Sequence, residues 1–216
     1  MYSVRQTISL VAADADGICQ SQTPSAGGTQ TLTMNGALVS GGVYTADQKR
    51  FVIITSAGND TARTFRITGT YEDLPQTEDL AGANAAAATS LKVWTTVTSI
   101  TIDGNSAGAL TVGTNDQAVT AWILTDHYCK HKEGVSVQVD VSTGATLNYT
   151  VQHTSDDLQD TTYYSDPDKF LTILNNDSAD IASATASNDG GYAVPPVAIR
   201  LKINSYTSGT AKLTVV

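Results

Sequence analysis

The densest group of residues that could do chemistry lies in the polar stretch Thr125–Gly134. It holds an aspartate, a cysteine and two histidines, which are Asp126, His127, Cys129 and His131. Such side chains bind transition metals such as zinc. The spacing follows neither a CxxC nor an HExxH pattern, and in an extended loop a fourth ligand must come from elsewhere. We therefore interpret the stretch as a solvated loop and assign no metal site.

A second group is a run of aspartates between Thr154 and Asp168. Calcium takes about six to eight oxygen ligands, so several carboxylates in one loop raise that alternative. The DxDxDG spacing is missing, and no glycine provides the sharp turn. We expect a solvated acidic loop, whose carboxylates belong to Asp156, Asp157, Asp160, Asp166 and Asp168.

Patterns typical of catalysis are weak. A single GxSxG match, Gly104–Gly108, falls on the turn expected at Asp103-Gly104-Asn105. No motif supports paired glycosidase carboxylates. Nothing places any of the three histidines, His127, His131 and His153, beside a serine and an aspartate. Trp94 and Trp122 could line a sugar platform, but at strand-like spacing aromatic residues more often belong to a core or an interface. We predict a protein that is not an enzyme and has no cofactor.

Composition and charge favour strands and exclude some partners. Hydrophobic residues make up 41% of the chain and charged residues only 15%, which suits sheets and turns better than helices. The net charge is −9 and the basic residues are scattered, with Lys130 and Lys132 closest to a patch. Direct binding to nucleic acid is therefore disfavoured. No apolar run approaches the roughly 18 residues of a membrane helix, and the apolar start Thr7–Ala13 favours a first strand over a signal peptide.

The two cysteines, Cys19 and Cys129, are far apart in the sequence and form no disulfide framework. We favour free thiols in a protein that is assembled in a reducing cytoplasm. A disulfide between them is the alternative.

The clearest strand pattern lies in Thr64–Val112, where Phe65 and Ile67 alternate with polar residues. An acidic turn is expected over Tyr71–Thr77. A second alternating segment has a break in phase near Ser99, and its apolar face is expected to hold Leu91, Val93, Thr95 and Val97, followed by Ile100 and Ile102. Between these segments the alanine-rich Leu80–Thr89 is short and has no amphipathic face, so we expect an extended crossover rather than a helix.

Turn residues between strand-like segments predict three hairpins. The expected pairs are Thr29–Met34 with Ala37–Val43 across Asn35-Gly36, Lys49–Thr55 with Thr64–Thr70, and Val135–Val141 with Ala145–His153.

Both halves of the chain end in a strand, a Ser/Gly turn and a Leu-Thr-Val strand, at Leu110–Val112 and at Leu213–Val215. About eleven to thirteen strands are expected, which exceeds one small sandwich. We predict an all-β fold with little helix and two jelly-roll-like β-sandwich units, residues 1–115 and 116–216.

A series of short segments of strand and turn residues extends over about residues 60–216. They are Arg66–Thr70, Thr77–Leu80, Gly82–Asn84, Val93–Ile100, Val112-Gly113, Val135–Asp140, Tyr149–His153, Gly191–Pro195, Ala198–Leu201 and Leu213–Val215. In this order they resemble a family of virion proteins of tailed bacteriophages. The chain departs from the family's pattern at Ala83 and Ala85, where a proline is more common, and at the pair Pro195-Pro196.

The resemblance implies a structural protein on the capsid exterior that decorates or cements the capsid lattice. Its implied partners are the major capsid protein and copies of itself in a homodimer or homotrimer, with no direct contact to nucleic acid or membrane. Such a protein is assembled in the host cytoplasm. The alternatives are a tail, neck or fibre-associated virion protein and a carbohydrate-binding β-sandwich or adhesin. The long loops Ala12–Gly28 and Thr154–Asp168 are expected to reach neighbouring subunits.

Overall fold

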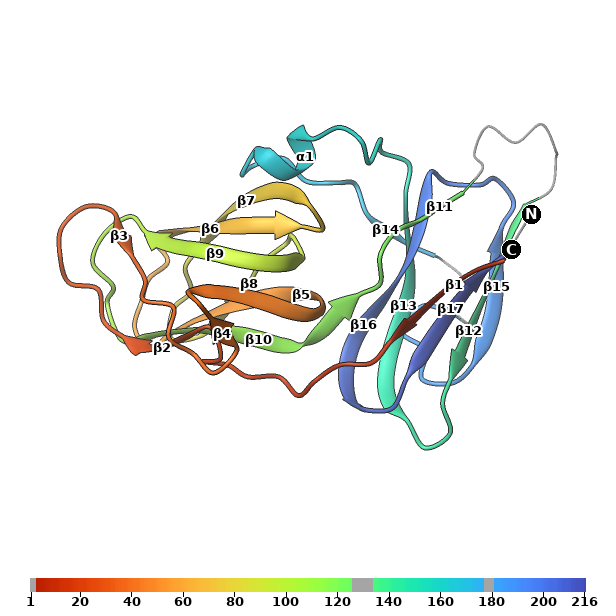
Figure 1. Ribbon diagram of the computed structural model, residues 1–216, viewed down its shortest axis with the longest axis horizontal. Helices are drawn as coiled ribbons and strands as arrows, with labels where there is room; N and C mark the ends of the chain where they lie inside the picture. Colours follow the sequence, from red (N-terminus) through yellow and green to blue (C-terminus); the bar gives the residue numbers. More distant parts are fainter. Residues whose placement is uncertain (1–2, 126–133, 177–180) are drawn as a thin grey trace. The chain divides into compact units, whose positions relative to one another are not determined.

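The computed structural model describes residues 3–125, 134–176 and 181–216 (Figure 1). Strands make up 54% of the chain and helix 2%, in large antiparallel sheets, so the predicted all-β sandwich fold is confirmed. The elements are β1 (Val4–Ile8), β2 (Cys19–Gln22), β3 (Gln30–Thr31), β4 (Val39–Ser40), β5 (Val43–Ser56), β6 (Thr64–Tyr71), β7 (Leu74–Ala81), β8 (Ala87–Thr89), β9 (Trp94–Ile102), β10 (Leu110–Val119), β11 (Ile123–Leu124), β12 (Val135–Val141), β13 (Thr146–Thr154), α1 (Thr162–Ser165), β14 (Leu174–Asn175), β15 (Asn188–Tyr192), β16 (Ala198–Ser208) and β17 (Ala211–Val215).

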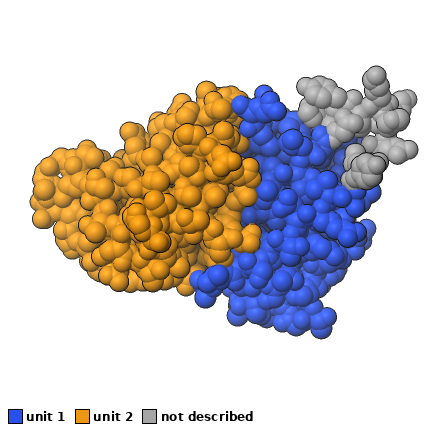
Figure 2. Space-filling model, in the orientation of Figure 1, with its two compact units in different colours: residues 1–12, 116–159, 171–216 blue, residues 13–115, 160–170 orange. Residues whose placement is uncertain are grey.

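The chain forms two compact units (Figure 2). Unit 1 consists of residues 1–12, 116–159 and 171–216, and unit 2 of residues 13–115 and 160–170. The chain passes from unit 2 to unit 1 between residues 115 and 116, and two further segments depart from a simple division into an N-terminal and a C-terminal half. The first twelve residues join unit 1 because β1 pairs with β17 along its whole length. Residues 160–170 join unit 2, where α1 packs on β7.

Unit 1 is a sandwich around one apolar core. One sheet has the order β1-β17-β12-β15, and the other contains β14, β13 and β16 with short pairings from β10 and β11. Alternate residues of both sheets meet in the core, among them Ile8, Val137, Tyr149, Leu201 and Leu213, each at most 1% exposed.

The predicted hairpin between Val135–Val141 and Ala145–His153 is wrong. β12 pairs with β15 and β17, whereas β13 pairs with β14 and β16. The turn closed by the Ala145 amide on the Ser142 carbonyl leads the chain from one sheet into the other. Both strands alternate because each buries one face against the same core, and this pattern is identical for paired strands and for strands that face each other.

Unit 2 is built on the strand order β10-β5-β9-β6-β7. β2 pairs with β10, β3 with β9, and both β4 and β8 with β5. Its core contains Val52, Phe65, Ile67, Trp94 and Ile100, all fully buried.

The other two predicted hairpins are also wrong. β6 pairs with β7 and β9 rather than β5, and β3 pairs with β9 rather than β4. β4 instead forms a hairpin with β5 across Gly41-Gly42, whose φ values of 60° and 79° suit a two-residue type I′ turn. Gly36 is needed for a close approach, because a Cβ there would lie 2.2 Å from the Gly17 backbone.

Of four local predictions for unit 2, two are confirmed and two are wrong. The alanine-rich stretch is extended, since β7 ends at Ala81 and β8 covers Ala87–Thr89. The register of β6 against β9 shifts between Thr68 and Gly69, opposite Ser99 and Val97, at the expected break in phase. The expected turn over Tyr71–Thr77 is shorter, because β7 begins at Leu74. Leu91 is 67% exposed because it precedes β9, so its assignment to the buried face was wrong.

Candidate binding surface

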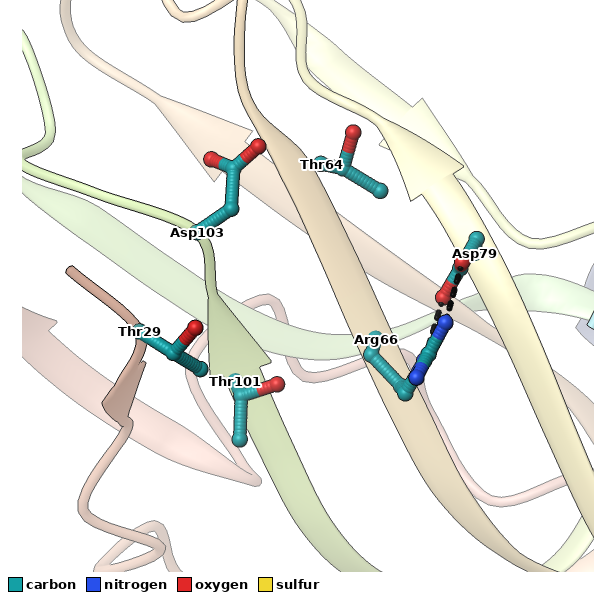
Figure 3. A pocket seen from close by; sticks show the side chains of 6 residues that line it. All are labelled: Thr29, Thr64, Arg66, Asp79, Thr101 and Asp103. Atoms are coloured by element: carbon teal, nitrogen blue, oxygen red, sulfur yellow. Dashed lines mark hydrogen bonds and ion pairs between the residues drawn. The ribbon is translucent and has the colours of Figure 1, made fainter.

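A pocket of about 360 Å³ lies on the solvent face of the β6–β7–β9 strands (Figure 3). Its lining comes from three strands and two adjoining loops of unit 2. The residues are Thr29, Thr64, Arg66, Asp79, Thr101 and Asp103. No lining side chain is apolar, so the pocket suits a hydrophilic ligand.

Strand alternation and register bring these residues together. Phe65 and Ile67 are fully buried, so Thr64 and Arg66 point to the opposite, solvent face of β6. Arg66 pairs in register with Asp79 on β7 and with Thr101 on β9. The guanidinium therefore belongs to the middle strand of three.

The Arg66–Asp79 ion pair is bidentate. Arg66 Nε donates to Asp79 Oδ1 and Nη2 donates to Oδ2, both at 2.7 Å. These hydrogen bonds raise the pKa of Arg66 above its ordinary value. Because the fork geometry fixes the guanidinium plane, the donors that remain on Arg66 point in defined directions.

A second polar cluster, which we call the lysine clamp, is buried in unit 2. Lys92 Nζ donates to the carbonyls of Thr77, Tyr164 and Asp166 at 2.8, 3.3 and 2.7 Å. Glu78 accepts the backbone N–H groups of Leu91 and Lys92 at 2.6 and 2.9 Å. The clamp thus holds the 160–170 segment on β7, where Tyr164 also stacks on Tyr71 with ring centroids 5.5 Å apart.

Burial dominates the electrostatics of the clamp. Glu78 is 1% exposed, and desolvation raises its pKa to about 7 although two backbone N–H groups and Lys92 act in the opposite direction. Desolvation also lowers the pKa of Lys92. Sequence analysis missed both residues. The available signal was the period-2 spacing of Gln76, Glu78 and Leu80, which places all three on the same buried face of β7.

The two tryptophans considered as a sugar platform do not form a shared exposed surface. Trp94 is fully buried in the core of unit 2. Trp122 is half-buried, and the Arg200 guanidinium lies 4.4 Å from its ring centroid. A platform of the kind that stacks on sugar rings therefore does not include Trp94.

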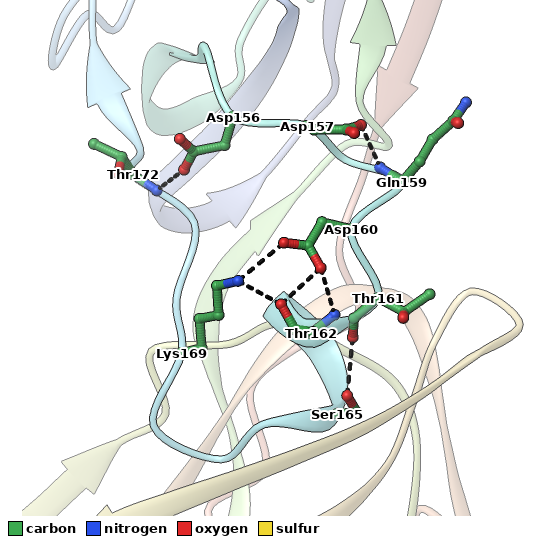
Figure 4. Close-up of polar contacts among 9 residues, drawn as sticks. All are labelled: Asp156, Asp157, Gln159, Asp160, Thr161, Thr162, Ser165, Lys169 and Thr172. Atoms are coloured by element: carbon green, nitrogen blue, oxygen red, sulfur yellow. Dashed lines mark hydrogen bonds and ion pairs between the residues drawn. The ribbon is translucent and has the colours of Figure 1, made fainter.

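The aspartates of the acidic loop are engaged in local hydrogen bonds (Figure 4). In unit 1, Asp156 accepts from the Thr172 amide and Asp157 from the Gln159 amide. In unit 2, Asp160 accepts from both the amide and the hydroxyl of Thr162 and pairs with Lys169, which together lower the pKa of Asp160 to about 2.

Asp166 caps the turn at the Asp168 amide. Across residues 3–125, 134–176 and 181–216, no three His, Cys, Asp or Glu side chains converge as metal ligands do. The loop is therefore shaped by turns of its own backbone, and α1 lies within it.

The other residues that the sequence suggested for metal binding, a basic patch, a disulfide or catalysis lie partly inside and partly outside the described part of the chain. The metal candidates Asp126, His127, Cys129 and His131, and Lys130 and Lys132 with them, lie outside the described residues. Cys19 is fully buried, and burial raises the pKa of its thiol to about 12. His153 contacts Tyr192, whose hydroxyl is 3.3 Å from its Nδ1. A pairing of Cys19 with Cys129 stays an untested alternative.

No protein-family model, curated protein or solved structure matches this chain. Within the described part of the chain, no helix has the length and apolar character to cross a membrane.

Proposed function

We propose that this protein is a structural component of a tailed-bacteriophage particle, which decorates or cements the capsid lattice from the outside. The observation that carries the proposal is the resemblance over about residues 60–216. Apart from Gly82–Asn84, its segments fall wholly or partly on strands of both units, namely β6, β7, β9, β10, β12, β13, β15, β16 and β17. The resemblance thus concerns the residues that build the fold.

The proposed partners are the major capsid protein and further copies of this chain, as a dimer or trimer. The solvent face of the β6–β9 strands is rich in hydroxyl groups and poor in charge, with Thr68, Thr70, Thr98 and Thr101 beside a single ion pair. A surface of this kind can pack against a protein with little desolvation of charge. Repetition over a lattice then strengthens contacts that are weak individually.

Purified particles of the source phage provide the test. Quantitative mass spectrometry of density-banded virions should find this chain in a fixed ratio to the major capsid protein. Cryo-electron microscopy of the same particles should place density for two β units at many equivalent positions on the shell. A host protein of similar abundance, measured through the same banding, controls for carry-over. Absence of the chain from banded virions overturns the proposal.

The copy number also separates the related alternative. A tail, neck or fibre-associated protein would be present in few copies, with density at one vertex. The fixed ratio then still assigns the chain to the virion but contradicts the cement role.

A further inference from the structure

We propose that the pocket formed by Thr29, Thr64, Arg66, Asp79, Thr101 and Asp103 is a binding site for a neutral saccharide. The proposal concerns the isolated protein and does not depend on a place in the virion. It also differs from a tryptophan platform, because Trp94 is buried and no aromatic ring lines this pocket.

The lining supplies the hydrogen-bonding groups that sugar hydroxyls need. Within the described residues, the hydroxyls of Thr29, Thr64 and Thr101 and the carboxylate of Asp103 have no protein partner. Each hydroxyl both donates and accepts, and the carboxylate accepts only. Two of the five N–H donors of Arg66 are used by Asp79, which leaves three that Asp79 does not engage. Vicinal diols match such a mixture, because each sugar hydroxyl also donates and accepts.

The charge of the lining disfavours anionic ligands. One guanidinium is opposed by two carboxylates, which gives the lining a formal charge of −1 (1 − 2) in a protein of net charge −9. The Arg66 guanidinium is already neutralised by the bidentate contact to Asp79. A phosphate or sulfate would gain no free cation here and would be repelled by Asp103.

Cationic and apolar ligands fit less well than a neutral polyol. Both oxygens of Asp79 are occupied by Arg66, so a cation would find only Asp103 and would leave three hydroxyls unused. Methyl and methylene groups form the apolar part of the lining, so a hydrophobic ligand would contact them but would leave the three hydroxyls and the Asp103 carboxylate covered and unpaired. A neutral saccharide is the class of ligand that can bind the threonine hydroxyls, the Asp103 carboxylate and the Arg66 guanidinium together.

The site is largely preorganised. Arg66 and Asp79 lie on β6 and β7, which are paired over eight residues, and Thr101 lies on the next strand, β9. Strand residues lose little freedom on binding, and the ion pair fixes the guanidinium. Because the pocket is open and lacks a stacking ring, we expect a dissociation constant on the order of 1 mM for a monosaccharide.

An NMR titration of the isotope-labelled full chain tests the site. The probes are the methyl glycosides of glucose, galactose, mannose, N-acetylglucosamine and rhamnose, each added separately. At least one should cause saturable shifts of the amides of residues 64–66, 79 and 101–103. Inorganic phosphate and lysine methyl ester serve as the anionic and cationic comparisons.

One variant tests the site and a second variant serves as the control. Asp103→Asn keeps the size of the side chain but removes its charge, and it should weaken glycoside binding about tenfold. Asp140→Asn makes the same change on the sheet of unit 1, where Asp140 pairs with Lys212 at 2.8 Å, and it should leave binding unchanged. The melting temperature of each variant shows whether the fold is intact.

Three results overturn the proposal. They are no saturable shift with any glycoside, shifts that map to another surface, and unchanged binding by a folded Asp103→Asn variant. Stronger binding of phosphate or of lysine methyl ester also contradicts it, because the lining would then select charge. None of these results bears on the capsid proposal, since the titration uses the purified chain alone.

Discussion

At the scale of single residues, Lys92 joins two stretches that are far apart in the sequence. Its ammonium takes the place of water for carbonyl groups on β7 and in the 160–170 segment, and it is only 7% exposed. The bonds to Thr77 and Asp166 are partly buried and the bond to Tyr164 is buried, so these carbonyls have restricted access to water as an alternative donor. The lysine therefore holds the segment in place by satisfying its backbone.

Replacing Lys92 with methionine should loosen the 160–170 segment. The methylene stem is preserved, but the clamp's carbonyls lose their donor, so we expect unfolding in urea to require about 2–4 kcal/mol less. Chymotrypsin should then cut after Tyr164, which is buried in the native protein. Lys169→Met, which breaks an exposed ion pair in the same segment, is the matched control and should change little. Equal resistance to chymotrypsin in all three proteins would argue against the clamp.

Glu78 should give the protein a specific dependence on pH. Its pKa is about 7 when folded against an ordinary value of 4.5, so the folded state binds this proton more tightly. The stabilisation is complete below about pH 4.5 and is lost as the pH rises through 7.

Relative to Glu78→Gln, which does not titrate, the wild-type free energy of unfolding should fall by about 3 kcal/mol between pH 4.5 and 7.5. Urea unfolding of both proteins at each pH isolates the effect, because all other groups cancel. Parallel curves would mean that Glu78 is charged throughout.

At the scale of elements, the irregularity between β6 and β9 depends on one glycine. A Cβ at Gly69 would lie 2.0 Å from the Thr96 carbonyl oxygen, where the register shifts. Gly69→Ala should therefore lower the free energy of unfolding by about 3 kcal/mol, because the strands must separate to admit a methyl group. Gly27→Ala, with open space around it, should change it by less than about 1 kcal/mol. Chemical denaturation of both variants checks this, and equal stabilities would show that β9 yields at Thr96.

Sequence patterns located strands far better than strand partners. The alternation of Phe65 and Ile67, and of the valines in β12, reports which face is buried, and this is a local property. The partner of a strand depends on contacts with distant parts of the chain, as for β12, which lies between β15 and β17. A short turn after a strand does not show whether the next strand joins the same sheet or another one. The pocket was equally invisible in sequence, because Thr29 and Asp79 meet only through the register of β3, β9, β6 and β7. Glu78 was missed because an acidic residue in a strand usually faces solvent.

At the scale of the whole molecule, unit 1 is discontinuous in sequence. Ile8 and Leu10 contribute to a core that is otherwise built after residue 115, and β1 covers an edge of β17. A cut between residues 115 and 116 therefore does not separate two self-sufficient units.

The fragment 116–216 should be poorly folded by itself and gain stability from a peptide of residues 1–12. The peptide supplies the strand that pairs with β17 and the buried side chain of Ile8. The melting temperature of the fragment should rise with peptide concentration. A peptide carrying Ile8→Ser is the control and should be much weaker. Cooperative unfolding of the fragment that is insensitive to peptide would contradict this account.

The strand order β1-β17-β12-β15 also has a consequence for synthesis on the ribosome. β1 is translated before the other strands described here, and its one partner in the described sheet, β17, is translated after them. The backbone hydrogen-bonding groups of Val4–Ile8 therefore stay without their native partner while the strands between β1 and β17 are translated. Such contacts between distant parts of a chain form slowly and leave nascent strands open to wrong partners. In a crowded polysome the neighbouring nascent chains carry the same strand, so chaperones that shield it should raise the yield of native protein.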